Sequence, residues 1–110
     1  MNLWHRDDEI TVEELKRRLD EGDRLVVLDV REPAEYALCN IGGTLIPLGS
    51  LPLRLNELNP AHEFVVLCHH GNRSRAAVDY LKKHGFQTVK NVTGGIEAWA
   101  QRIDRTMRRY

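Results

Sequence analysis

Residues 65–77, VVLCHHGNRSRAA, place a cysteine directly after an apolar run and before two histidines, a glycine and two arginines. Cysteine reacts as the thiolate, and positive charge or a helix N-terminus lowers the thiol pKa to roughly 3.5–7.5. A helix that begins near Ser74 would direct unpaired backbone N–H groups toward Cys68. Gly71 lets the loop turn where a side chain would block it. The spacing therefore predicts a nucleophilic sulfur at the base of an anion-binding loop.

Charged side chains follow this cysteine closely. Arg73 and Arg75 are expected to add fixed positive charge, and His69 and His70 to add more when protonated. The alternative for Cys68 is simple packing at the end of a buried strand, but the glycine and arginine spacing favours a functional role. For the two histidines, a substrate-related role and a solvated surface role are equally open. Neighbours in sequence are expected to point in different directions, so no zinc site is predicted here.

The elements that would position Cys68 alternate between strands and helices. The segments 25–28 and 63–68 contain short, unalternated apolar runs, which are typical of parallel strands buried on both faces. Further short strands are expected within 41–48 and 87–92. The expected helices and helical turns occupy the remaining patterned segments: 12–21, a turn from Glu32-Pro33, 50–58 with Ser50 as its cap, 73–85 and 93–105.

Two of these helices show a clear apolar face. In the segment 73–85 the inward residues are expected to be Ala77, Tyr80, Leu81 and His84, and in 93–105 they are Ile96, Trp99 and Ile103. The alternating order predicts a three-layer α/β fold, with a mainly parallel central sheet and helices on both sides. Reactive crevices of such folds lie at the carboxyl ends of the strands, which is where Cys68 stands.

The composition excludes several classes of function. The 110 residues suit one domain, with residues 1–8 as an N-terminal extension and 104–110 as a basic C-terminal tail. Sixteen basic residues balance sixteen acidic ones, which argues against nucleic-acid binding. No apolar run suits a membrane span and no secretory signal is visible, so a cytoplasmic location with free Cys39 and Cys68 thiols is expected. Without a nucleotide-binding glycine loop or a metal-ligand cluster, no cofactor and no metal are expected.

Four motifs in order resemble the rhodanese-like sulfurtransferases. CHHGNRS is similar to the active-site loop of that family, and LDVREPAEY, NIGGTLIPL and TGGIEAW resemble three further signatures spread over nearly the whole chain. The resemblance implies a rhodanese-like fold and a Cys68 thiolate that takes the outer sulfur of a donor such as thiosulfate, becoming a persulfide. It also implies that backbone N–H groups of the loop hold the sulfur. The loop residues carried over by the match are His69, His70, Gly71, Asn72, Arg73 and Ser74.

The resemblance implies partners but leaves their identity open. The donor would be thiosulfate or a persulfide, and the acceptor a thiol, cyanide or a sulfur-carrier protein. Asp29 and Arg31 of the first signature are interpreted as support for the loop, through an ion pair or brace at a strand end. The second signature usually carries Gly-His where this chain has Cys39-Asn40. Cys39 is either a small buried residue or a partner that resolves the persulfide as a disulfide, and the first interpretation is favoured.

Two other functions are alternatives to sulfur transfer for this sequence. A cysteine-dependent phosphatase or arsenate reductase would need a loop one residue longer between Cys68 and Arg73, because phosphate is larger than one sulfur. A non-catalytic interaction or regulatory module would usually lack the cysteine, which is present here. The basic C-terminus is interpreted as a solvated helix face with a frayed end, or as a site that recruits an acidic carrier protein. Its arginines are Arg102, Arg105, Arg108 and Arg109.

Overall fold

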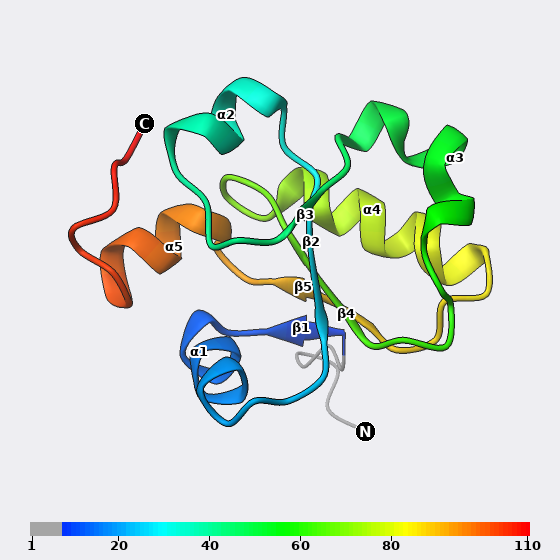
Figure 1. Ribbon diagram of the computed structural model, residues 1–110, viewed down its shortest axis with the longest axis horizontal. Helices are drawn as coiled ribbons and strands as arrows, with labels where there is room; N and C mark the ends of the chain where they lie inside the picture. The colour runs from blue at the N-terminus through cyan, green and yellow to red at the C-terminus, as the bar shows by residue number, and fades with distance from the viewer. Residues whose placement is uncertain (1–7) are drawn as a thin grey trace.

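The computed structural model describes residues 8–110, and these form a five-stranded sheet with helices on both sides (Figure 1). The strand order is β1-β5-β4-β2-β3, and every neighbouring pair is parallel. The predicted α/β fold with a parallel central sheet is therefore confirmed. The strands are β1 (Glu9–Ile10), β2 (Val26–Asp29), β3 (Thr44–Leu45), β4 (Phe64–Leu67) and β5 (Val89–Val92).

Helices connect the parallel strands and cover the two faces of the sheet. In Figure 1, α3 and α4 lie on one side of the sheet and α1 on the other. The helices are α1 (Val12–Asp20), α2 (Pro33–Leu38), α3 (Leu51–Arg54), α4 (Asn72–Lys83) and α5 (Gly95–Arg102), with 3₁₀ turns η1 (Leu48–Ser50) and η2 (Leu55–Glu57) on either side of α3. No helix within residues 8–110 is long and apolar enough to cross a membrane.

The two faces of β4 pack into two separate apolar clusters. Phe64, Val66 and Cys68 belong to the cluster under α3 and α4, whereas Val65 and Leu67 belong to the cluster under α1 and α5. Every residue of β4 is buried, as expected for a central parallel strand. The alternation of side chains along the strand therefore places the sulfur of Cys68 on the α4 side of the sheet.

Two sequence expectations about elements are corrected, and one strand was missed. The segment 50–58 is not one helix: Pro52 lies in the first turn of the four-residue α3, 3₁₀ turns replace the rest, and the Ser50 side chain makes no capping hydrogen bond. His84 does not face inward, because α4 ends at Lys83. Its exposed ring instead lies 2.8 Å from the Tyr80 carbonyl oxygen. Strand β1 was not expected, since two residues are too few to show a strand pattern.

The ends of the described chain are tied to the folded body. Of the extension expected at residues 1–8, only Asp8 is described, and the rest lies outside the described residues. Asp8 is buried, and its carboxylate accepts hydrogen bonds from Arg75 and Lys82. At the other end, Met107 packs against the α1–α5 cluster and Tyr110 reaches the loop after β4. The segment 104–110 is therefore not a frayed end in this structure.

Candidate active site

The sulfur of Cys68 is buried but surrounded by hydrogen-bond donors. Cys68 follows the last residue of β4, and only 1% of it is exposed. Its Sγ accepts the backbone N–H of Gly71 at 3.1 Å and the hydroxyl of Ser74 at 3.2 Å. Donors directed at one sulfur can stabilise negative charge that develops on it, because a hydrogen bond to a charged acceptor is stronger than one to a neutral acceptor.

The N-terminus of α4 adds further positive potential on the same side. Gly71 is the N-cap with φ of 110°, a left-handed conformation that a residue with Cβ rarely adopts. The first helical hydrogen bond runs from the Arg75 N–H to the Gly71 carbonyl. The amides of Asn72, Arg73 and Ser74 precede that bond, so they have no acceptor within the helix. The loop can therefore offer several backbone donors to an anion attached to Cys68.

A buried network behind the sulfur was missed at the sequence level. Asn91 on β5 is 4% exposed, accepts the Ser74 hydroxyl at 2.5 Å and donates to the Gly71 carbonyl at 3.2 Å. It also donates to Glu9 on β1. Asn91 thus fixes both groups that hydrogen-bond the sulfur. An asparagine between the buried residues Val89 and Val92 of a strand was the available signal, because a buried amide needs partners.

Ser74 has one hydroxyl proton and two acceptors, Cys68 Sγ and Asn91 Oδ1. When the sulfur is a thiolate, the proton can point to the sulfur; when it is a thiol, S–H can donate to Ser74 while Ser74 donates to Asn91. Both protonation states of Cys68 are therefore hydrogen-bonded without any movement of heavy atoms.

The two arginines of the loop have different surroundings. Arg73 forms a bidentate pair with Glu35 of α2, at 2.6 and 2.8 Å, and this pairing lowers the pKa of Glu35 to about 2. Arg75 was expected to add charge near the sulfur, but it pairs with Asp8, Glu9 and Asp79 instead. That expectation was wrong, because residues two apart on a helix point to nearly opposite sides.

Asp29 and Arg31 form a buried ion pair at the carboxyl end of β2. Their side chains are 1% and 0% exposed, and Arg31 Nη2 lies 2.8 Å from Asp29 Oδ2. The same guanidinium donates to the backbone carbonyls of Cys39 and Glu35. Arg31 therefore joins the end of β2 to α2, which carries the partner of Arg73. The ion pair expected from the sequence is therefore present, and its support of the loop stays a prediction.

Helix α5 holds the other side of the loop. The backbone N–H groups of Ile96 and Glu97 donate to the carbonyls of Cys68 and His69, at 2.9 and 3.0 Å. Gly95 makes this approach possible, since a Cβ there would lie 2.4 Å from the His69 oxygen and 2.5 Å from the Cys68 oxygen. The paired glycines of the C-terminal signature therefore place α5 directly against the loop.

Aromatic rings cover the outer part of the loop. The His69 ring stacks between His70 and Tyr110, with both centroid separations at 4.0 Å. The expectation that the two histidines point in different directions was therefore wrong. The Tyr110 hydroxyl accepts from Arg31 at 3.0 Å and donates to Glu35 at 2.8 Å. This contact with the final residue of the given sequence was not foreseen, because no local pattern links it to the loop.

The remaining candidates do not converge on the sulfur. Cys39 and Cys68 are both free thiols. Cys39 packs against the α1–α5 cluster, whereas Cys68 belongs to the other cluster, so this structure does not favour a disulfide between them. In the basic C-terminus, Arg102 pairs with Glu13 and Arg109 with Glu97.

Comparison with known proteins agrees with this combination of parallel sheet and cysteine loop. The family model "Rhodanese-like domain" matches residues 11–102. A sulfurtransferase from Allochromatium vinosum is 37% identical over 95 residues, which cover 86% of this chain and 89% of that protein. The crystal structure of a rhodanese-related protein from Thermoplasma volcanium has a TM-score of 0.76 and 33% identity, covering 84% of this chain and 90% of that one.

The site and fold thus define a parallel α/β domain in which a cysteine sulfur lies next to the N-terminus of a helix. The chain belongs to the rhodanese-like domain family. Another relative, the candidate sulfur carrier protein YrkF of Bacillus subtilis, is 41% identical over 97 residues. The match covers 87% of this chain but only 52% of YrkF, so the chain spans about half the length of that relative.

Proposed function

We propose that this domain is a sulfurtransferase that carries a sulfane sulfur as a persulfide on Cys68. The observation that carries the proposal is the pair of donors, Gly71 N–H and Ser74 Oγ–H, at 3.1 and 3.2 Å from the sulfur. The names of the Allochromatium and Bacillus relatives, a sulfurtransferase and a candidate sulfur carrier, support the same chemistry.

The proposed reaction has two displacement steps. The Cys68 thiolate attacks the outer sulfur of thiosulfate; an S–S bond forms between Cys68 Sγ and that sulfur, the S–S bond of thiosulfate breaks, and sulfite leaves with the electron pair. The acceptor, for instance cyanide, then attacks the terminal sulfur, takes it as thiocyanate, and returns the thiolate. The negative persulfide sulfur would be stabilised by the loop from His69 to Ser74, through its free amides and the charge of Arg73. Asp29 and Arg31 would hold α2 and the end of β2 in place around it.

Intact-mass spectrometry after treatment with thiosulfate tests the proposal. The protein is expected to gain the mass of one sulfur atom and to lose it when cyanide is added, with formation of thiocyanate. Cys68→Ser should abolish both, whereas the matched variant Cys39→Ser should retain them, since Cys39 lies in the other apolar cluster. A wild-type protein that gains no sulfur from thiosulfate or from a small persulfide, or Cys68→Ser that still gains it, would refute the proposed chemistry.

A further inference from the structure

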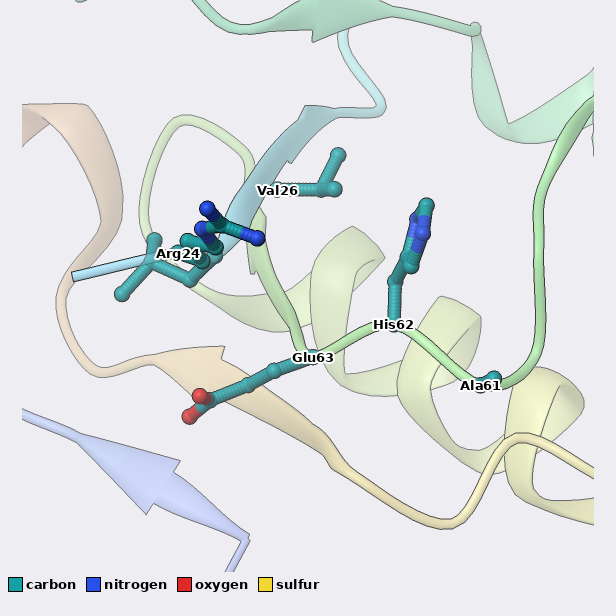
Figure 2. Close-up of a pocket in the computed structure, with 6 residues that line it drawn as sticks. Arg24, Val26, Ala61, His62 and Glu63 are labelled. Atoms are coloured by element: carbon teal, nitrogen blue, oxygen red, sulfur yellow. The ribbon is translucent and has the colours of Figure 1, made fainter.

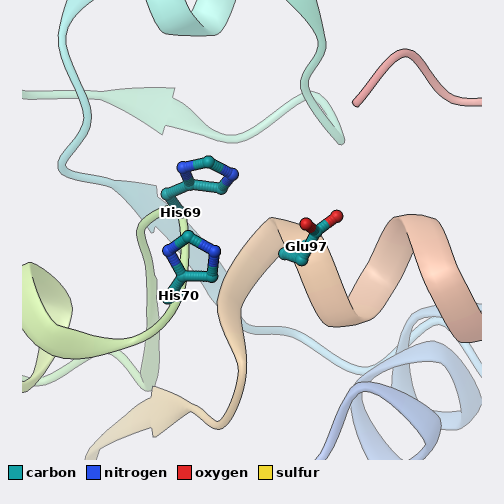
Figure 3. A group of neighbouring side chains, drawn as sticks. All are labelled: His69, His70 and Glu97. Carbon is teal, nitrogen blue, oxygen red and sulfur yellow. The ribbon is translucent and has the colours of Figure 1, made fainter. Parts of the chain in front are cut away.

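Three metal-ligating side chains meet at the outer edge of the loop. One ligand atom each from His69, His70 and Glu97 lies within 4.8 Å of the other two. Figure 3 shows the two imidazole rings on the loop after β4, one above the other, beside Glu97 on α5. None of these side chains contacts the Cys68 sulfur through a hydrogen bond recorded in residues 8–110, so the group is separate from the donors described above.

The fold itself imposes this proximity. The Glu97 N–H donates to the His69 carbonyl at 3.0 Å, which fixes the backbone of α5 against that of the loop. Gly95 permits the contact, as described above, and Tyr110 stacks on His69 from the outer side at 4.0 Å. These contacts fix the backbone positions from which the carboxylate and the two imidazoles extend toward one another.

Charged groups surround the three side chains. Those that face His69 from the packed elements, besides His70 and Glu97, are Glu35 and Arg73, which form an ion pair with each other. Glu97 itself pairs with Arg109. The site therefore offers two imidazoles and one carboxylate to a cation, and its carboxylate already binds a positive group.

We propose that His69, His70 and Glu97 form a binding site for a borderline divalent cation, with Zn²⁺ as the representative ion. Two histidines and one glutamate are a ligand set that binds zinc and leaves a fourth position for water or a small ligand. The stacked His69 and His70 rings are inclined to each other by 25°. One of the rings must therefore turn for one nitrogen of each imidazole to face the same ion. The exposed ring of His70 has room for this movement. The binding does not depend on sulfur transfer.

The cation would compete with the C-terminal segment. Arg109 Nε lies 2.7 Å from Glu97 Oε1, and this pair is exposed on the arginine side, with 54% of that side chain accessible. A divalent ion on the carboxylate would release Arg109 into solvent at little cost, because exposed ion pairs contribute little. Removal of Arg109 should therefore tighten zinc binding, which distinguishes this site from a nonspecific histidine surface.

Isothermal titration of tag-free protein with ZnCl₂ tests the site, in a Cys39→Ser/Cys68→Ser background that removes thiolate ligands. His70→Ala and Glu97→Gln are each expected to weaken binding by more than about tenfold, the loss typical even of an outer-shell partner. Arg109→Ala should tighten binding several-fold. His62→Ala and His84→Ala, which change exposed histidines elsewhere, are the matched controls and should leave it unchanged. Co²⁺ bound to the parent should show the intense visible bands of tetrahedral coordination.

The proposal fails if zinc does not bind the parent, or if His70→Ala and Glu97→Gln bind it as tightly as the parent does. It also fails if the two control variants lose as much affinity, which would show scattered binding to surface histidines. Circular dichroism of each variant without metal separates these results from unfolding. A protein that binds zinc in this way but gains no sulfur from thiosulfate would refute the proposed function alone.

Discussion

The two ends of the sheet differ in what their polar residues do. At the amino ends of β2 and β4, an open hollow of about 530 Å³ has a histidine and two charged residues in its wall (Figure 2). Glu63 and His62 point away from one another there, and Glu63 is already paired with Arg18. The hollow is lined by Arg24, Leu25, Val26, Ala61, His62 and Glu63.

At the carboxyl ends, by contrast, hydrogen-bond donors converge on a single atom. Cys68 is 1% exposed, yet two donors meet on its sulfur, and the groups behind them are fixed by Asn91, Glu35 and Arg31. The difference teaches that aligned donors and buried partners, rather than the volume of a hollow, distinguish the end of this domain that we propose to be reactive. Stabilising an anion requires dipoles that are already oriented toward it. The side chains that line the hollow at the amino ends point in different directions and do not supply such dipoles.

The largest expected effect comes from the ion pair between Asp29 and Arg31, compared with one at the other end of the sheet. Asp29→Asn would leave the Arg31 charge without its partner in a fully buried site, so we expect a loss of about 3–5 kcal/mol in the free energy of unfolding. Glu63→Gln is the matched change at the other end, where Arg18 and Glu63 are 18% and 22% exposed, and it should cost about 1 kcal/mol or less. Urea denaturation of both variants measures the difference, and equal losses would contradict the contrast.

The glycines provide the next largest effect. Gly95→Ala adds a Cβ 2.4 Å from the His69 carbonyl oxygen at a φ of 61°, so α5 must move away from the loop. We expect a loss of about 2–3 kcal/mol, of which the left-handed conformation alone accounts for about 1–2 kcal/mol. Gly85→Ala is the control: its φ is 92°, but nothing lies within 4 Å of the added Cβ.

The two glycine variants also separate an effect on stability from an effect on sulfur transfer. Gly85→Ala should keep the rate of thiocyanate formation near that of the wild type, while Gly95→Ala should lower it because the Cys68 and His69 carbonyls lose their amide partners. If both variants lose the same stability and activity, the contact between α5 and the loop does not have the role assigned to it.

Removing one donor from the sulfur should have a smaller effect. Ser74→Ala deletes the hydroxyl at 3.2 Å from Cys68 Sγ, and a hydrogen bond to a charged group contributes about 1.5–3 kcal/mol. We therefore expect Ser74→Ala to slow thiocyanate formation from thiosulfate and cyanide by about tenfold or more, because a loss of about 1.4 kcal/mol in stabilisation of the negative sulfur corresponds to a factor of ten. Ser74→Cys, which keeps a weak donor, should give a rate between those of the wild type and Ser74→Ala. An unchanged rate in Ser74→Ala would show that this hydroxyl does not stabilise the negative sulfur.

The contacts that the sequence predicted are those formed by neighbours along the chain. The apolar run of β4, the turn at Gly71 and the start of α4 are local, and they placed Cys68 correctly at the carboxyl end of a central strand. The parallel sheet also followed from short unalternated apolar runs. In these segments, local conformational preference and burial act in the same direction, so the pattern alone was sufficient.

The contacts that were missed join residues far apart in the sequence. Ser74 and Asn91 are 17 residues apart, Arg73 and Glu35 are 38, and Tyr110 and Glu35 are 75. Such pairings depend on how helices and strands are placed in space, which a local pattern does not encode. The failed assignment of Arg75 is different, because the helical period already places it on the side opposite Arg73.

The smallest expected effect concerns the acid stability of the Glu35–Arg73 pair. Hydrogen bonding to Arg73 lowers the pKa of Glu35 from its ordinary value of 4.5 to about 2. A carboxyl whose pKa is lowered by folding stabilises the protein above pH 4.5, and this contribution disappears as the pH falls toward 2. Glu35→Gln should therefore be less stable than the wild type at pH 7, by about 1 kcal/mol for a pair near the surface, and equally stable near pH 2. Urea unfolding across that range measures the difference.

Glu63→Gln is the control at the other end of the sheet. The Arg18 pairing also lowers the pKa of Glu63, so this variant should show the same sign of pH dependence but leave the rate of Cys68 alkylation unchanged. Glu35→Gln should slow that alkylation, because Arg73 would lose its partner on α2. Identical alkylation rates in the two variants would mean that the two ends of the sheet do not differ in this respect.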